Sequence, residues 1–325
     1  KSFVDLYVML SSCVPATHLE TSGAKLSAQD LLPFKHHPKV LGLAEMMNYP
    51  GVLYKDRGVL EKLYEFQDVH IDGHSPMLRG RDLNAYLACG IKTCHESVSL
   101  PEAREKLQRG MQVLLREGSV AKNLKELVGI LDEYSSPHVS LCTDDRNPAD
   151  ILDEGHLDYM IRVAIQKGVA PEVAYRTASL STAKLFGIKN KGALAPGYAA
   201  DIVILKNVKK CQVADVIKNG KLVSKETLGD YEVQAPIDNS IRARIPSVAD
   251  LHVPGHMKSK GQSSNKVRVI GIIKDSIVTE SLMASLPVDD MFMLQNDLKK
   301  DILKIAVVER YGHGRKPSVG FVKGM

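Results

Sequence analysis

The chain has 325 residues and a hydrophobic content of 44%, which is enough to bury a sizeable core in more than one domain. A net charge of +5 spread along the chain, the lack of Trp and an aromatic content of 5% give little support to nucleic-acid binding. Every apolar run is shorter than the roughly 18 residues that span a bilayer, and no signal-peptide pattern opens the chain, so we expect a cytoplasmic protein without membrane contact.

Short apolar runs alternate with helical patterns through the first 188 residues. Strands are predicted to begin near residues 4, 40, 69, 90, 111 and 139, and the first covers residues 4–10. One of the helices between these strands is predicted to start after Ser99, because Ser99 and Glu102 match a capping box. Alternating strands and helices are typical of a parallel sheet. Six such units are two fewer than a complete (β/α)8 barrel contains. One further helix is predicted to start at residues 27–30, and the others cover residues 60–64, 80–86, 124–131, 157–165 and 171–186.

From Gly192 onward the pattern changes to short strands joined by Gly, Pro and Asn turns. Residues 192–205 and 213–223 are predicted to form an all-β piece of ~40 residues, which is too small to fold alone. A third region begins near Gln234. It is predicted to contain a loop at 246–265, strands at 267–273 and 302–308, and a helix at 278–286 between the strands.

Four of the predicted strands deliver a metal-binding residue type at their C-terminal ends: Glu45, His74, His95 and Asp144. In a parallel barrel these ends meet at one face, so the four side chains are expected to converge. Two imidazoles and two carboxylates suit zinc, iron or manganese and are poor ligands for calcium. A divalent ion held this way generates a hydroxide nucleophile at neutral pH, which predicts hydrolytic chemistry. Asp144 could then take a proton from water and return it to the leaving group.

A second motif lies earlier in the chain, where His18 and Glu20 match the first half of the zinc deaminase pattern H-x-E followed by P-C-x-x-C. The second half occurs nowhere in the sequence, which excludes that class. Glu20 is therefore interpreted either as a pocket carboxylate or as a solvated loop acid.

Several residues near the predicted ligands have two interpretations. Asp145 could bind substrate or form an ion pair with Arg146, and Glu96 could be a functional or a structural carboxylate. His70 lies on the strand that leads to His74 and is expected to pack in the core. The five cysteines are odd in number and lie mostly in apolar runs, so we interpret them as reduced thiols.

Taken together, several stretches resemble the bacterial and archaeal adenine deaminases, a family of the amidohydrolase superfamily. Residues 171–188 and 192–203 look like the barrel end and composite β domain of that superfamily, and residues 301–310 look like the C-terminal domain particular to adenine deaminases. The stretches around the predicted ligands that carry the resemblance are 42–48 (GLAEMMN), 72–76 (DGHSP), 94–96 (CHE), 116–119 (REGS) and 142–146 (CTDDR).

The resemblance implies hydrolysis of adenine to hypoxanthine and ammonia in purine salvage, with manganese or iron as cofactor and zinc as an alternative. It implies that Glu45 is a metal-bridging carboxylate, that His74 and His95 are imidazole ligands, and that Asp144 is a ligand that shuttles protons. Glu96 is a second candidate catalytic residue. A homo-oligomer with adenine as its small-molecule substrate is expected. The candidate substrate-binding residues are Glu20, Arg116, Ser119 and Asp145.

Within an α/β fold class, the resemblance divides the chain into three parts. Residues 1–188 would be an incomplete (β/α)8, TIM-like barrel that lacks its first strands, residues 189–233 part of a composite β-sandwich, and residues 234–325 a C-terminal α+β domain. The His-x-His of the family's first barrel strand has no counterpart here, and the chain opens at Lys1 and ends at Met325 within apolar patterns. We therefore expect a chain truncated at both ends that binds metal poorly by itself, and an active parent protein.

Three alternatives stay open at this point. The chain could belong to another amidohydrolase branch, such as a dihydroorotase or an amino-sugar deacetylase. It could be an inactive fragment that has kept only a binding role. A nucleic-acid binder would depend on the pI of about 8.8 and on the basic stretch 310–316.

Overall fold

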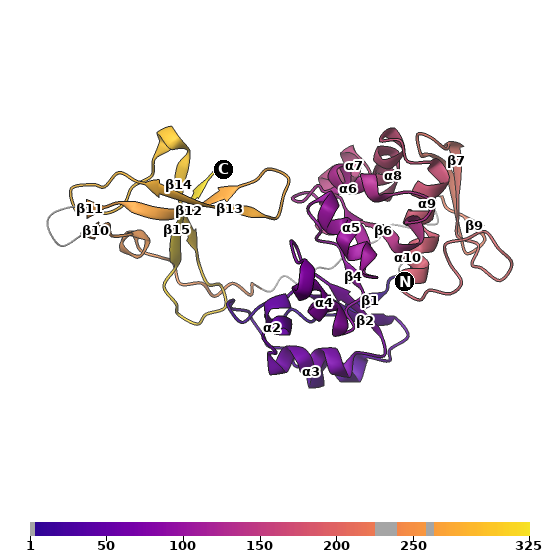
Figure 1. Cartoon of the computed structure of the whole chain (residues 1–325), viewed down its shortest axis with the longest axis horizontal. Coiled ribbons are helices and arrows are strands. Elements are labelled where there is room, and N and C mark those ends of the chain that lie inside the picture. Colours follow the sequence, from indigo (N-terminus) through magenta and orange to yellow (C-terminus); the bar gives the residue numbers. More distant parts are fainter. Residues whose placement is uncertain (1–3, 225–238, 258–262) are drawn as a thin grey trace. The chain divides into compact units, whose positions relative to one another are not determined.

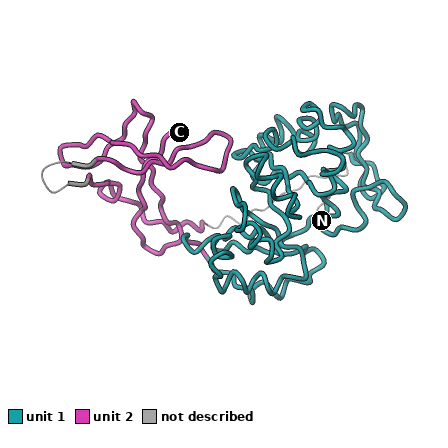
Figure 2. The backbone as a smooth tube through the Cα atoms, in the orientation of Figure 1, with its two compact units in different colours: residues 1–20, 24–232 teal, residues 21–23, 233–325 magenta. Residues whose placement is uncertain are grey.

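The computed structural model describes residues 4–224, 239–257 and 263–325. The chain forms two compact units, residues 1–20 with 24–232 and residues 21–23 with 233–325 (Figure 2). The predicted start of the third region, near Gln234, lies outside the described residues. Within the described ranges, none of the helices is long and apolar enough to cross a membrane.

The first unit contains two three-stranded parallel sheets whose strands follow one another in chain order (Figure 1). The backbone nitrogen of Lys92 donates to the oxygen of Ile71 at 3.0 Å, which ties the end of the first sheet to the start of the second. All six predicted strands are confirmed, although the first is shorter than residues 4–10. They are β1 (Val8–Leu10), β2 (Val40–Met46), β3 (His70–Gly73), β4 (Thr93–Cys94), β5 (Gln112–Arg116) and β6 (Val139–Cys142).

Helices separate these strands, as predicted from the sequence. The predicted helix 171–186 is two helices, because Ser179 leaves the helical region with φ −131° and ψ −83°. The predicted capping box at Ser99 is wrong, since the Ser99 side chain makes no hydrogen bond that caps the helix. Glu102 instead accepts from the backbone nitrogens of Val98 and Met77. The α-helices are α1 (Ala28–Leu31), α2 (Tyr49–Leu53), α3 (Arg57–Glu65), α4 (Gly80–Ala88), α5 (Leu100–Gln108), α6 (Leu124–Leu127), α7 (Pro148–Asp153), α8 (Leu157–Gln166), α9 (Pro171–Ala178) and α10 (Leu180–Leu185), and the 3-10 helices are η1 (Leu32–Phe34), η2 (Val128–Ile130) and η3 (Ser136–His138).

Each sheet of the first unit has its own apolar core. Leu43 and Ile71 on β2 and β3 pack with buried residues of α3 and α4, while Val113 and Leu115 on β5 pack with those of α6 and α8. Close packing also fixes the backbone, because a Cβ at Gly42 would lie only 1.9 Å from the carbonyl oxygen of His70. The two cores hold the strand ends, where the candidate ligands lie, in place.

The β piece that follows is confirmed from residue 202 onward. It comprises β7 (Ile202–Asn207), β8 (Gln212–Lys218) and β9 (Lys221–Leu222), paired antiparallel, whereas residues 192–201 form no strand. The carboxylate of Asp201, immediately before β7, accepts from Lys218 Nζ at 2.9 Å and from the backbone nitrogen of Asn219 at 2.9 Å. Lys191 also bonds Asp201, so this acid fastens the two strands to the preceding loop.

The second unit is a mixed four-stranded sheet of order β13-β12-β15-β14 over the core residues Val269, Leu286, Leu294, Ile302 and Phe321. Its strands are β12 (Lys266–Ile272), β13 (Thr279–Ser285), β14 (Ile302–Val307) and β15 (Ser318–Lys323). The predicted loop 246–265 holds the 3-10 helix η4 (Val248–Leu251) and the strand pair β10 (His256–Met257) and β11 (Ser263–Ser264), and a further 3-10 helix is η5 (Leu298–Lys300).

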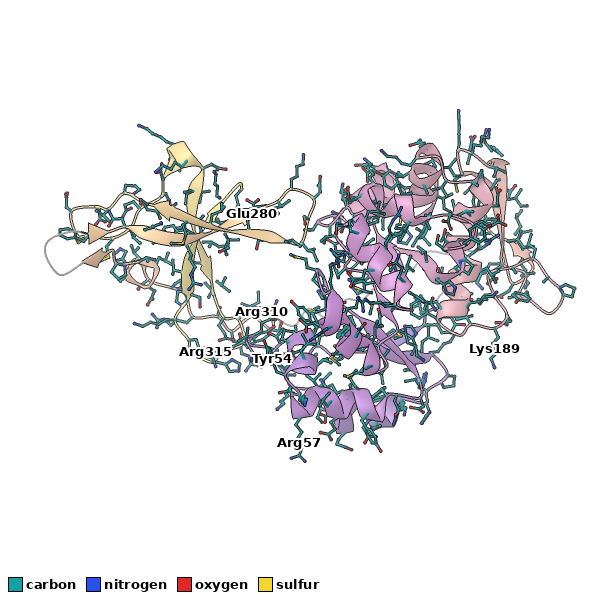
Figure 3. The ribbon with its side chains drawn as sticks, in the orientation of Figure 1. Tyr54, Arg57, Lys189, Glu280, Arg310 and Arg315 are labelled. Atoms are coloured by element: carbon teal, nitrogen blue, oxygen red, sulfur yellow. The ribbon has the colours of Figure 1, made fainter. Side chains whose placement is uncertain are left out.

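The predicted helix 278–286 is wrong, because those residues form β13. Leu282 and Ala284 are half-buried and alternate with the exposed Met283 and Ser285, a period of two that is typical of a strand. Glu280 on the same strand is exposed (Figure 3). Since the described part of this unit contains no α-helix, the α+β expectation is not met there.

Candidate metal centre

The first unit brings the four predicted ligands together at the C-terminal ends of its strands. Glu45 is the penultimate residue of β2, His74 and His95 follow β3 and β4 directly, and Asp144 lies just beyond β6. Glu45 Oε2 is 3.0 Å from His74 Nδ1 and 3.0 Å from His95 Nε2. Asp144 Oδ2 is 3.5 Å from His95 Nε2. One carboxylate oxygen thus lies between two imidazoles, with a second carboxylate beside them.

Glu96 completes the cluster from the residue after His95. It is 1% exposed, and its Oε1 lies 3.5 Å from His95 Nε2 and 3.8 Å from His74 Nδ1. Among the described residues, the candidate donor atoms form two overlapping sets, Glu45–His74–His95 and His95–Glu96–Asp144, each within 4.8 Å. The position of Glu96 favours its interpretation as a functional carboxylate.

The charges in the cluster attract a cation. Burial acts against the charged form of His95, but the hydrogen bond that its ring donates to Glu45 and the charge of the nearby Asp72 outweigh burial and raise the pKa of His95 to about 9. Burial likewise opposes ionisation of Glu45, yet the two imidazoles lower the pKa of Glu45 to about 2. A carboxylate and two imidazole nitrogens directed at one point, in a field that stabilises positive charge, fit a divalent metal ion.

Asp72 supports His95 from behind and was not predicted as a functional residue. Its Oδ2 is 3.8 Å from His95 Nδ1, and its other oxygen accepts from the hydroxyl of Thr93 and from the backbone nitrogen of Gly73 at 2.9 Å. Such outer carboxylates orient ligand imidazoles and increase their basicity. A signal was present in the sequence, since residues two apart on a strand share a face and Asp72 lies two residues before His74.

Arg116 links three of the acids around the centre. Its Nη1 pairs with Glu96 Oε1 and lies 3.1 Å from Asp144 Oδ2, and its Nη2 lies 3.0 Å from Asp145 Oδ1. These carboxylates overcome the effect of burial and raise the pKa of Arg116. The alternative pair of Asp145 with Arg146 is wrong.

Arg146 instead makes its contacts with the loop after α7. Its Nη2 lies 2.6 Å from Glu154 Oε2 and its Nε donates to the oxygen of Gly155 at 2.8 Å. Its guanidinium also lies 4.8 Å from the ring centroid of Tyr159 on α8.

Two candidate substrate-binding residues, Ser119 and Glu20, make their hydrogen bonds with residues outside the cluster. The Ser119 hydroxyl bonds Asp150 and accepts from the backbone nitrogen of Asn147 at 2.8 Å. Glu20 is exposed in a loop, where its backbone nitrogen donates to the oxygen of Thr17. His70 packs in the core as predicted, with its ring centroid 5.0 Å from that of Phe186.

A cavity of about 260 Å³ opens beside the cluster. Asp144 reaches it from a left-handed backbone conformation with φ 49°, which Asp tolerates better than most residues. Its side chain is 37% exposed, so a small molecule in the cavity can reach the carboxylate. The cavity is lined by Ala44, Glu45, Asp72, His95, Leu114, Cys142 and Asp144.

Comparison with known proteins identifies two family models. The model described as "Amidohydrolase family" matches residues 1–223, and the model described as "Adenine deaminase C-terminal domain" matches residues 276–325. Among solved structures, the N-acetyl-D-glucosamine-6-phosphate deacetylase of Mycobacterium smegmatis aligns with a TM-score of 0.49 and 16% identity, over 62% of this chain and 60% of that one.

Curated relatives match over the whole chain. The adenine deaminase of Brucella anthropi is 48% identical over 325 residues, and that of Gluconobacter oxydans is 48% identical over 326 residues. Each alignment covers 100% of this chain and 56% of the relative. The chain thus spans about half the length of the curated relatives that it matches.

Proposed function

The chain belongs to the amidohydrolase family, and from this premise we propose that its full-length protein hydrolyses adenine to hypoxanthine and ammonia at a metal centre. The observation that carries the proposal is the position of Glu45 Oε2, 3.0 Å from both His74 Nδ1 and His95 Nε2, with the three residues at the C-terminal ends of three different strands. The identity of 48% to an adenine deaminase along the whole chain supports adenine as the substrate.

The proposal extends to the architecture. We propose that the six parallel strands are part of a (β/α)8 barrel within residues 1–188, because they follow in chain order and their C-terminal ends carry the site. Residues 189–233 would contribute to a composite β-sandwich, and residues 234–325 would be the C-terminal domain of the adenine deaminase type, which the match at 276–325 supports. Assembly as a homo-oligomer stays a prediction.

Glu45, His74, His95 and Asp144 would hold the ion. Imidazole and carboxylate donors suit manganese or iron, with zinc as an alternative. When bound, such an ion acts as a Lewis acid that makes water a nucleophile at neutral pH.

We propose that Asp144 moves the protons of the reaction. Its carboxylate is the most exposed of the cluster's acids, lies 3.5 Å from His95 and is oriented by Arg116 at 3.1 Å. It can accept the proton of the attacking water and deliver it to the departing amine of adenine, a transfer that contributes about 10²- to 10⁴-fold to a rate.

Glu96 provides a second acid for the substrate. Its Oε2 is buried and makes no hydrogen bond to any described residue, while its Oε1 is held by Arg116. Burial raises the pKa of Glu96, and we propose its carboxyl group as the second candidate for proton transfer. We propose that Asp145, which is fixed by the same arginine, binds substrate. Glu20 and Ser119 stay predictions, because Ser119 bonds Asp150 and Asn147 and Glu20 is exposed in a loop.

The test is an assay of the full-length, metal-replete protein with adenine and, separately, with dihydroorotate. We expect ammonia and hypoxanthine from adenine in equal amounts and no turnover of dihydroorotate. Turnover of dihydroorotate alone would move the protein to another branch of the family. A protein that retains no divalent ion would favour the inactive, binding-only alternative.

A further inference from the structure

Two fully buried polar side chains reach from the helices to the segments that carry the candidate ligands. They are Tyr86 on α4 and Lys106 on α5, and both have 0% exposed surface. Neither contributes a donor atom to the cluster described above. Burying an ammonium group is costly unless its partners compensate for the lost water, so what Lys106 contacts is informative.

Lys106 Nζ donates to three residues, and each of them is adjacent in sequence to a different residue of the cluster. It donates to the oxygen of Ser75 at 2.8 Å, to Cys94 Sγ at 3.2 Å and to Ser97 Oγ at 3.2 Å. Ser75 follows His74, Cys94 precedes His95, and Ser97 follows Glu96. One ammonium group therefore joins the segment after β3 to the segment after β4.

Glu102, one turn earlier on α5, neutralises the ammonium and extends the connection. Its Oε1 lies 2.7 Å from Lys106 Nζ and accepts from the backbone nitrogen of Met77 at 2.9 Å, while its Oε2 accepts from that of Val98 at 3.1 Å. Burial opposes the charge on Lys106, but the partners Cys94 and Glu102 raise its pKa. The lysine is thus a charged connection between both segments.

Tyr86 makes the corresponding connection between β2 and β3. Its hydroxyl donates to the oxygen of Met46 at 2.6 Å and accepts from the backbone nitrogen of His74 at 3.0 Å. Met46 is the residue after Glu45, so one hydroxyl links two of the ligand-bearing segments.

We propose that Lys106 and Tyr86 are positioning residues that hold the backbone of the ligand-bearing segments so that Glu45, His74 and His95 converge on the ion. This inference rests on the proposed metal centre. A buried ion pair adds little stability compared with apolar packing of the same volume, so its effect is expected in the geometry of the segments that it joins. Groups that support a ligand from outside typically change metal affinity by about 10- to 100-fold.

The test uses Lys106→Met in the full-length protein, which removes the charge and keeps most of the side-chain volume. We expect the Mn²⁺ dissociation constant to rise about 10- to 100-fold, measured by equilibrium dialysis with metal analysis. At saturating Mn²⁺, KM for adenine should stay within about twofold, because neither residue contacts the substrate cavity. The matched control is Leu107→Ala, the next residue of α5, which packs against the other core cluster and should lower the melting temperature without changing Mn²⁺ affinity.

Tyr86→Phe is the second variant, in case Lys106→Met does not fold, because it removes only one hydroxyl. It should weaken Mn²⁺ binding by about tenfold. Unchanged Mn²⁺ affinity in a folded Lys106→Met or in Tyr86→Phe would overturn the inference while the metal centre stands. If the unaltered full-length protein bound no Mn²⁺, the proposed function itself would fail and the inference with it.

Discussion

At the scale of single residues, Glu45 is the side chain on which the centre depends most. It contacts both imidazoles with one oxygen, and its low pKa keeps it ionised. In Glu45→Gln the amide presents an oxygen of weak basicity and an NH₂ group that repels a cation. We expect metal affinity to fall by more than the roughly 10- to 100-fold that an outer residue costs, so that elemental analysis after gel filtration finds less metal bound than in the unaltered protein.

The control for that variant is Glu61→Gln, since Glu61 is exposed on α3 and bonds Gln29. Its metal content should equal that of the unaltered protein. Normal metal content in Glu45→Gln would show that the other ligands suffice and that Glu45 has a different role.

Asp144 gives a second prediction, which concerns rate rather than binding. Asp144→Asn keeps the size of the side chain and its tolerance for the left-handed backbone, but removes the proton acceptor. We expect kcat for adenine to fall about 10²- to 10⁴-fold with a smaller change in KM, measured by steady-state kinetics at saturating metal. Asp153→Asn, on the exposed face of α7, should behave as the unaltered enzyme. A variant with full kcat would assign proton transfer to another group, with Glu96 as the first to examine.

At the scale of elements, the attachment of β7 and β8 depends on Asp201. Burial acts to raise the pKa of Asp201, but Lys191 and Lys218 outweigh it and hold that pKa well below its usual range. A carboxylate whose folded pKa is depressed stabilises the fold above its unfolded pKa of about 3.9, and this stability is lost as the pH falls through the folded value.

We therefore expect Asp201→Asn to lower the free energy of unfolding by about 1 kcal/mol at pH 7. The difference from the unaltered protein should shrink as the pH falls from about 4 toward 2, because Asp201 then binds a proton in the unfolded state while it is still ionised in the folded state. Denaturant unfolding at several pH values measures this. Asp215→Asn, exposed on β8, is the control, and a difference independent of pH would exclude the ionic explanation.

The element scale also shows what periodicity can and cannot predict. The six parallel strands were predictable because each is a short apolar run between helical patterns. Residues 278–286 were mistaken for a helix, since Val278, Leu282 and Leu286 lie four residues apart. In the structure Leu282 and Leu286 face the core of a sheet together with Ala284, and the pairing with β12 determines the outcome. Local spacing alone carries no information about that partner strand.

The convergence of side chains at the strand ends was predictable only in part. Glu45, His74, His95 and Asp144 lie together as expected, because metal-binding residue types at strand ends are chemically distinctive, and their role as ligands stays a prediction. Lys106 was not found, because within α5 it looks like one more charged residue of an amphipathic helix. Only the tertiary structure shows that its side chain points inward.

At the scale of the whole molecule, the candidate ligands all belong to the first unit. Mn²⁺ at 100 times its dissociation constant would stabilise the folded state of that unit by about 2.7 kcal/mol. Hydrogen exchange of the full-length protein should therefore show slower exchange in β2, β3 and β4 on addition of Mn²⁺, and unchanged exchange in β12 to β15. Ca²⁺ at equal concentration is the control, since the donor set suits it poorly. Equal protection of both units would contradict an ion held by the first unit alone.

The contact between Gly42 and the carbonyl of His70 has a practical consequence for engineering. Even one methyl group at position 42 would push β2 and β3 apart. Gly42 lies three residues before Glu45, and its neighbour His70 lies four residues before His74. Mutant libraries that vary the cavity should therefore leave this glycine unrandomised, although it lies outside the cavity lining, because most alternatives there would displace the strand ends that carry the candidate ligands.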